Sequence, residues 1–188
     1  MKNVKLIAIA FVATLSMTSM VGQTKKVIVE KSKINWVGKK VTGQHEGTVN
    51  FKDGALVFKG QKLKGGSFTV DMNSLTATDL QGEYQGKLNG HLKNDDFFAT
   101  DKFPTSTLVF KKIADKGNNT YAVTADLTIK NITNPVTFDI VVNGNTAKTN
   151  LKVDRTKYDI KYGSGSFFTS LGDKTINDDF EMSVNLMF

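Results

Sequence analysis

The sequence contains no cysteine, only two prolines and two histidines, and a single arginine, Arg155, among its 25 basic residues. Without cysteine, no disulfide, thiol nucleophile or thiolate metal site can form, so packing and hydrogen bonding alone must hold the fold. Two histidines leave little material for a metal site or for acid–base chemistry. A chain of 188 residues is long enough to bury a core without cross-links, and it fits one domain.

The sequence also lacks a hydrophobic run long enough to cross a bilayer as a helix. The apolar run at residues 6–13 follows Lys2 and Lys5 and precedes small residues up to Gly22, which is the order of a secretory signal peptide. We therefore predict a signal peptide over residues 1–22, with Gln23 first in the mature chain, and export to the periplasm or out of the cell. Loss of the two lysines lowers the formal charge from +7 to +5, and this basic balance permits attraction to anionic lipid headgroups.

What the sequence does have is period-two alternation of apolar residues from residue 25 onward, the pattern of strands with two different faces. The clearest runs lie at residues 34–36, 49–58, 68–72, 108–110, 121–129, 136–142, 151–153 and 180–188. About eight strands close a barrel whose interior is filled by side chains or holds one small ligand. We predict an all-β fold, an antiparallel eight-stranded β-barrel, as one domain over residues 23–188.

Three dipeptides are expected to form turns between strands. Asp-Gly at residues 53–54 is a preferred two-residue hairpin loop. With that loop, the apolar residues on its two sides pair across the hairpin and share one face. Asn-Pro at residues 134–135 and Asn-Gly at residues 143–144 are further turn signals.

One segment breaks the strand rhythm and predicts a short helical insert within residues 79–93. Leu80, Tyr84, Leu88 and Leu92 recur every four residues, which gives one apolar stripe on a helix. Three glycines in this segment each cost about 1 kcal/mol relative to alanine, so packing must stabilise the helix. An irregular loop is the alternative.

Four segments resemble the YceI-like, polyisoprenoid-binding family. They are GHLKNDDFFATDKFP at residues 90–104, WVGKKVTGQHEG at 36–47, DLTIKNITNPV at 126–136 and RTKYDI at 155–160. The resemblance extends over residues 25–188 and implies a lipocalin-like antiparallel barrel whose elongated interior encloses an isoprenoid or a similar amphiphile. One departure is Asp159, where many members carry glycine, so the resemblance does not fix the turn after Tyr158.

A polyisoprenoid needs a long apolar cavity, because each buried methylene contributes about 0.8 kcal/mol and the headgroup needs only a few polar contacts. The alternative is a solid core, since hollow and filled barrels share the same alternation; the family resemblance favours the hollow one. The candidate lining of the cavity is Trp36, Phe51, Phe58, Phe68, Val70, Met72, Phe110, Tyr121, Val123, Phe138, Ile140, Met182 and Val184.

Arg155 and His91 are the candidates for contact with a headgroup. A guanidinium binds carboxylate or phosphate with two parallel hydrogen bonds, which lysine does not. The alternative for Arg155 is a structural ion pair with Asp154, Asp159 or another acid. For His91 it is a position at or just after the end of the helix. No metal site, cofactor or catalytic residue is predicted, because no ligand spacing and no nucleophile with its base is present.

The loop that follows the helix carries three aromatic rings, Phe97, Phe98 and Phe103. They cannot alternate cleanly between the inside and the outside of a barrel, so at least one ring is expected to plug a barrel end. The ring could serve as a static plug or as a gate for ligand entry, and the sequence does not distinguish these two roles.

The predicted function is non-catalytic binding, sequestration or transport of an isoprenoid-type lipid, such as a quinone or a polyprenyl phosphate, with transient membrane contact and no nucleic acid. One alternative is an outer-membrane β-barrel, suggested by the alternating apolar residues that lead to Phe188. Paired lysines at residues 39–40 and 111–112 argue against it, because lysine on a lipid-facing wall costs roughly 2–4 kcal/mol. Another alternative is an enzyme that acts on a lipid or quinone, using His91 beside Asp95 and Asp96.

Overall fold

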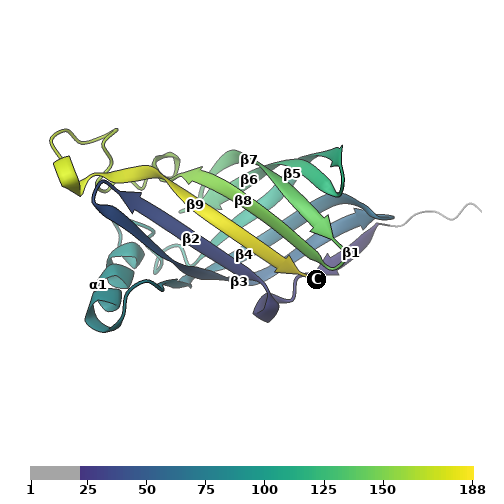
Figure 1. The fold of residues 1–188 in the computed structure, drawn as a ribbon, viewed down its shortest axis with the longest axis horizontal. Helices are drawn as coiled ribbons and strands as arrows, with labels where there is room; N and C mark the ends of the chain where they lie inside the picture. Colours follow the sequence, from purple (N-terminus) through teal and green to yellow (C-terminus); the bar gives the residue numbers. More distant parts are fainter. Residues whose placement is uncertain (1–21) are drawn as a thin grey trace, which may run out of the picture.

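The structure, a computed structural model, describes residues 22–188. The predicted signal peptide therefore lies, apart from Gly22, outside the described residues. Nine strands follow one another in this part of the chain (Figure 1). They are β1 (Gln23–Lys26), β2 (Lys33–Lys40), β3 (Gly43–Lys59), β4 (Lys62–Ala77), β5 (Thr105–Gly117), β6 (Thr120–Ile129), β7 (Ile132–Asn143), β8 (Thr146–Asp154) and β9 (Ile176–Met187).

The strands form one antiparallel sheet that closes on itself. Its order is β1-β3-β2-β9-β8-β7-β6-β5-β4, and β4 also pairs with β3. The pairing of β3 with β4 closes the ring and leaves β1 outside it, so β2 to β9 make the closed eight-stranded barrel that the alternation predicts. β1 is an addition of four residues that pairs only with the last part of β3.

One predicted turn is wrong, and the reason is a β-bulge. Residues 53–54 lie in the middle of β3, whose register against β4 shifts between Phe51 and Asp53. One extra residue in a strand moves the following side chains to the other face. Val49 and Phe51 before the bulge and Leu56 and Phe58 after it are all buried. A bulge and a two-residue hairpin loop both move the apolar side chains from odd to even sequence positions, so the sequence pattern does not distinguish them. The actual turn follows at Gly60, which has a φ of +60°.

The second predicted turn, at residues 134–135, is also wrong, since both residues lie within β7 and pair with β6. The turn lies just before it, where Lys130 and Asn131 have φ values of +50° and +60°. Proline is tolerated here because β8 pairs with β7 only from Ile140 onward. The absence of an N–H on Pro135 therefore removes no hydrogen bond between these strands. The third turn, after Asn143, is confirmed, with Gly144 at a φ of +59°.

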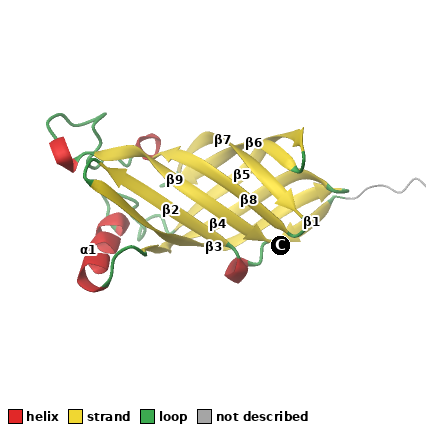
Figure 2. Cartoon of the chain, in the orientation of Figure 1, coloured by secondary structure: helices red, strands yellow, loops and turns green. Residues whose placement is uncertain are grey.

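The predicted helix is confirmed as α1 (Gly82–Lys93), which covers one end of the barrel (Figure 2). Two side chains tie it to the end of β4: Gln85 Nε2 donates to the carbonyl of Ala77, and Asn89 Oδ1 accepts from its N–H, both at 2.8 Å. Only part of the predicted stripe is covered. Leu92 is buried and Leu88 packs on the core, whereas Tyr84 is 73% exposed. Three short 3₁₀ helices, η1 (Val29–Lys31), η2 (Arg155–Tyr158) and η3 (Gly172–Lys174), complete the described elements.

The end of the barrel opposite α1, called the distal end below, is closed by aromatic packing. The rings of Phe58 and Phe188 have centroids 5.7 Å apart, and the ammonium group of Lys25 lies 5.3 Å and 5.1 Å from these two centroids. Tyr121 and Val123, from the first half of β6, are buried in the core. This arrangement leaves the hollow part of the barrel nearer to α1.

Candidate functional site

The barrel interior contains a cavity, called the main cavity below, which leaves about 120 Å³ open to the centre of a water-sized sphere. A single water needs about 10–15 Å³ by this measure. The apolar side chains that alternate along the strands therefore surround a hollow and do not fill it. The wall is apolar apart from three hydroxyl residues, Ser106, Thr107 and Thr149.

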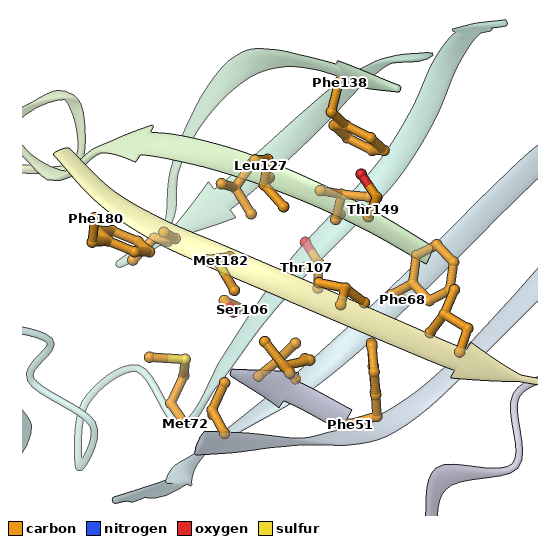
Figure 3. A pocket seen from close by; sticks show the side chains of 18 of the residues that line it. Phe51, Phe68, Met72, Ser106, Thr107, Leu127, Phe138, Thr149, Phe180 and Met182 are labelled. Atoms are coloured by element: carbon orange, nitrogen blue, oxygen red, sulfur yellow. The ribbon is translucent and has the colours of Figure 1, made fainter. Parts of the chain in front are cut away.

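Most of the predicted lining residues face this cavity. Nine of them are Phe51, Phe68, Val70, Met72, Phe110, Phe138, Ile140, Met182 and Val184. In Figure 3, Phe180 lies at one end of the cavity and Phe68 at the other. A chain of neighbouring rings runs along one side, from Phe51 to Phe68 at 6.0 Å between centroids, on to Phe110 at 5.6 Å, and on to Phe138 at 5.9 Å.

Four predicted lining residues lie elsewhere. Phe58, Tyr121 and Val123 are buried but do not line the main cavity, and Phe58 belongs to the closed distal end. Trp36 lines a second, smaller cavity. Alternation identifies the face on which a side chain lies, but it does not determine which of the inward side chains border open space. Tyr121 and Val123 pair directly with Ile140 and Phe138, which line the main cavity, and yet they do not line it themselves.

The structure adds lining residues that the sequence reasoning did not select. They are Ile34, Val49, Leu75, Phe98, Ser106, Thr107, Leu108, Leu127, Ile129, Thr149, Leu151, Phe180 and Leu186. Most of them belong to the alternating runs, so the strand pattern was sufficient to find them. Leu75, Ser106, Thr107 and Thr149 lie on the strands but outside those runs. Phe98 lies on no strand, because it belongs to the segment between α1 and β5 and shows in the sequence only as one ring of an aromatic loop.

The second cavity lies toward α1 and has a mixed wall. It leaves about 70 Å³ open by the same measure, and Arg155, Asn177 and Asp179 add polar groups to a wall that is otherwise largely apolar. Phe97 and Phe98 both line it, and Phe97 is buried. The expectation that at least one ring of the aromatic loop plugs a barrel end is thus confirmed.

Arg155 is 2% exposed, and its guanidinium donates hydrogen bonds to three backbone carbonyls. Its Nε donates to the carbonyl of Asn177 at 3.0 Å, Nη1 to that of Ile160 at 2.8 Å, and Nη2 to that of Ile176 at 3.0 Å. Nη2 also lies 3.7 Å from Asp178 Oδ1. Burial lowers the pKa of Arg155, and the charges of Asp178 and Asp154 oppose this shift. Arg155 therefore has a structural role, and it also lines the second cavity as a charged group.

His91, the other headgroup candidate, lines neither cavity. Its ring packs edge-on against Tyr162 at 4.4 Å and against Phe97 at 5.5 Å between centroids. Asp95, which the enzyme alternative places beside His91, forms an exposed ion pair with Lys102 at 2.7 Å. The geometry that would let His91 act on a ligand in either cavity is absent from the described residues.

Among the other titratable groups, Asp179 lines the second cavity, whereas His45 and Tyr158 line neither cavity. His45 Nδ1 lies 2.7 Å from Asp79 Oδ2 on the outside of the barrel. Burial and the charge of Asp154 raise the pKa of Tyr158 to about 12, and this residue lines neither cavity. Among residues 22–188, no three side chains of the metal-binding types come together. No helix in this part of the chain has the length and apolar character needed to cross a membrane.

The departure at Asp159 has a clear structural setting. Asp159 has a φ of +57° and ψ of +34° and ends η2 in the left-handed region, which glycine adopts without steric cost. Aspartate is one of the few other residues that enter this region. Its carboxylate forms an ion pair with Lys161 at 2.8 Å. The turn therefore keeps the backbone conformation that glycine favours.

A closed antiparallel barrel around an apolar cavity is the architecture of the lipocalin-like class of β-barrels. Within that class, this chain belongs to the YceI-like family, whose family model matches residues 26–188.

Relatives with similar sequence match in part. A UPF0312 protein of Shewanella denitrificans is 35% identical over 91 residues, which is 48% of this chain and 46% of that protein. UPF0312 proteins of Staphylococcus aureus are 46% identical over 56 residues, 30% of each chain. These matches therefore span less than half the length of the relatives.

Solved structures support the fold along nearly their whole length. BcnA of Burkholderia cenocepacia aligns with a TM-score of 0.68 at 25% identity, over 86% of this chain and 99% of that one. A polyisoprenoid binding domain of Saccharophagus degradans, implicated in plant cell wall breakdown, has a TM-score of 0.58 at 15% identity, over 86% and 95%. The YceI protein of Campylobacter jejuni has a TM-score of 0.55 at 19% identity, over 98% and 96%.

Proposed function

We propose that this protein binds an isoprenoid-type lipid, such as a quinone or a polyprenyl phosphate, in the barrel interior and carries or sequesters it without chemical change. The observation that carries this proposal is the main cavity, an internal hollow with an almost wholly apolar wall. Burial of an alkyl chain there is favourable by about 0.8 kcal/mol for each methylene. Membership of the YceI-like family and the likeness to a polyisoprenoid binding domain support the same ligand class.

The place that we propose for the polar end of a ligand long enough to extend past the main cavity is the second cavity, beside Arg155. The guanidinium has five N–H donors, and the three carbonyls that it meets leave capacity for a ligand oxygen. His91 is no longer a candidate, since it lines neither cavity.

A non-catalytic role fits the side chains around the hollow. The main cavity has hydroxyl groups but no histidine, carboxylate or lysine in its wall. Proton transfer needs such a group within hydrogen-bond reach of the reacting atom. Partition of the lipid between solvent, membrane and barrel is then the whole mechanism.

The barrel exterior favours an aqueous setting over the outer-membrane alternative. Charged pairs join different strands on the outer surface. Lys39 of β2 lies 2.8 Å from Glu181 of β9, and Lys111 of β5 lies 3.4 Å from Asp126 of β6. Lys116 of β5 reaches across β6 to Asp139 of β7 at 2.6 Å. A barrel wall that faces lipid carries an apolar band in place of such pairs. The export route and a periplasmic or secreted location remain part of the proposal, and fractionation of the native host without detergent is their direct test.

The experiment that tests the ligand is native mass spectrometry of the protein purified from its own host, followed by solvent extraction of the bound molecule. The expected result is an isoprenoid lipid in stoichiometric amount. In the variant Phe138→Asp, a carboxylate at the main cavity should expel this lipid, because an unpaired charge in an apolar site costs several kcal/mol. Thr137→Asp, on the neighbouring exposed position of β7, is the matched control and should retain it.

Two outcomes would contradict the proposal. One is a protein that carries no lipid when it is purified without detergent. The other is retention of the lipid by a folded Phe138→Asp variant, which would put the ligand outside the main cavity.

We also propose transient membrane contact through the loop between η2 and β9. Phe167 and Phe168 are each 50% exposed, and Tyr162 is 46% exposed. The ammonium group of Lys161 lies 5.1 Å from the centroid of the Phe167 ring, so apolar and cationic groups occur together there. Exposed rings beside lysine suit an anionic bilayer surface. In sedimentation with phosphatidylglycerol vesicles, Phe167→Ser with Phe168→Ser should bind several-fold less, and equal binding would refute the contact.

A further inference from the structure

The two cavities meet at one wall. Leu75, Phe98 and Phe180 are the residues that line both of them. The rings of Phe98 and Phe180 stand nearly perpendicular, with an interplanar angle of 84° and 6.3 Å between centroids. This aromatic pair, together with Leu75, is the partition between the main cavity and the second cavity.

The two rings of the partition are held to different degrees. Phe180 belongs to β9 and pairs on one side with Gly38 of β2 and on the other with Val153 of β8, so its backbone is fixed within the sheet. Phe98 lies outside every strand, and its N–H donates to the carbonyl of Leu92 at 3.1 Å. Its side chain is half-buried. Rotation of the Phe98 ring breaks no strand pairing, whereas displacement of Phe180 would need a shift of the sheet.

Space beyond the partition is present before any ring moves. Gly38 lines the second cavity, and a Cβ built on it would meet no atom within 4 Å. Trp36, two residues earlier on the same face of β2, lines the same cavity. The strand thus carries a residue without a side chain at the point where the barrel interior continues past Phe180.

We propose that the two cavities form one lipid channel divided by Phe98, and that the Phe98 ring determines which chain lengths the protein holds. A short isoprenoid fits within the main cavity while the ring stays in place. A longer one turns the ring aside and extends into the second cavity. This inference rests on the proposed function, because it assigns a length preference to the same ligand class.

Two variants separate the effect of the partition from that of the space behind it. Phe98→Ala removes the ring and joins the cavities. Gly38→Leu leaves the ring in place and fills the second cavity, at a position whose backbone accepts a side chain without strain. The two changes should therefore act in opposite directions on the same measurement.

The measurement is competition between farnesol and the much longer solanesol for the delipidated protein, read by native mass spectrometry as the ratio of the two complexes. Relative to the wild type, Phe98→Ala should raise the solanesol-to-farnesol ratio by about tenfold or more, since each added methylene that becomes buried favours the longer chain. Gly38→Leu should lower the ratio by a similar factor, because it fills the space that the longer chain enters.

Phe110→Ala is the matched control, because Phe110 is an aromatic residue that lines the main cavity and not the second one. It should weaken both complexes and leave their ratio within about twofold of the wild type. An unchanged ratio in folded Phe98→Ala would overturn the partition, even if Gly38→Leu failed to fold. A wild-type protein that holds neither alcohol would overturn the proposed function as well, so the two failures are distinguishable.

Discussion

The two ends of this barrel are closed by different forces. At the distal end, Phe58 stacks on Phe188 and apolar side chains fill the interior. At the α1 end, a buried guanidinium holds three carbonyls, the aromatic residues Phe97 and Phe98 lie over a second cavity, and the neighbouring loop exposes Phe167 and Phe168. Packing of apolar side chains closes the distal end, whereas the hydrogen bonds of Arg155 at the α1 end leave space and a charged group beside the main cavity. The comparison assigns a structural role to the distal end, and under the proposed function it makes the α1 end the place of ligand exchange.

The largest effect on stability is expected from Arg155→Met. The substitution keeps most of the side-chain volume but leaves three carbonyls and Asp178 without their partner. Removal of one member of such a buried set costs about 3–5 kcal/mol of unfolding free energy. Urea denaturation of the wild type and the variant measures this loss of unfolding free energy. Lys157→Met, in the same η2 turn but on an exposed side chain, should change the free energy by less than about 0.5 kcal/mol. A loss below about 1 kcal/mol for Arg155→Met would mean that the α1 end does not depend on this residue.

A smaller effect is expected at the distal end from Phe58→Leu. The variant loses the ring contact with Phe188 and part of the buried area, which amounts to about 1–2 kcal/mol. The loss should not change with pH between neutral and mildly acidic values, because the contact that is lost joins two hydrocarbon rings. Urea denaturation at two pH values tests both statements. A strongly pH-dependent loss would remove the contrast between the ends.

The smallest effect is a dependence on pH at the α1 end, through Asp178. Burial raises the pKa of Asp178, but hydrogen bonds from Ser164 and Ser166 and the charge of Arg155 outweigh burial, so the pKa lies below its ordinary value of 3.8. A folded-state pKa below the unfolded one stabilises the protein above the unfolded value, and this stability is lost as the pH falls through the folded value. The contribution is below about 1 kcal/mol, as is usual for partly exposed pairs.

The check is the difference in unfolding free energy between the wild type and Asp178→Asn as a function of pH. The difference should be constant above pH 5 or so and shrink at lower pH. Amide hydrogen exchange should at the same time show residues 155–160 opening before the strands around Phe58. Simultaneous opening at both ends would argue against separate stabilisation.

The sequence predicts the barrel itself because alternation, strand number and the family motifs agree. It misplaces residues where two structures produce the same pattern. Asp53-Gly54 is such a case, since a bulge and a two-residue hairpin loop both move the following apolar residues from odd to even sequence positions. Pro135 is another, because whether proline breaks a strand depends on which neighbour is paired there.

The sequence predicts that the candidate site is an apolar cavity inside the barrel, but it predicts less well which residues line that cavity. Phe68, Phe110 and Phe138 face the cavity as alternation requires, whereas Phe58 shares their pattern and lies beyond the hollow. Phe98 could not be assigned in advance, because its place in the barrel comes from the tertiary fold of a loop that has no periodicity.

The pairing of β2 with β9 has a consequence for how the chain folds. Lys33 faces Asn185 across this seam, so the wall is complete only after segments at opposite ends of the described chain have met. Contacts of such long sequence separation slow folding, because the entropy of loop closure opposes them. Until that meeting, β2 and β9 each present an unpaired edge, and without β9 the unpaired edges would be those of β2 and β8. Such an edge is a site of aggregation. A truncated chain without residues 176–187 should accordingly accumulate in inclusion bodies and need a chaperone to remain dispersed.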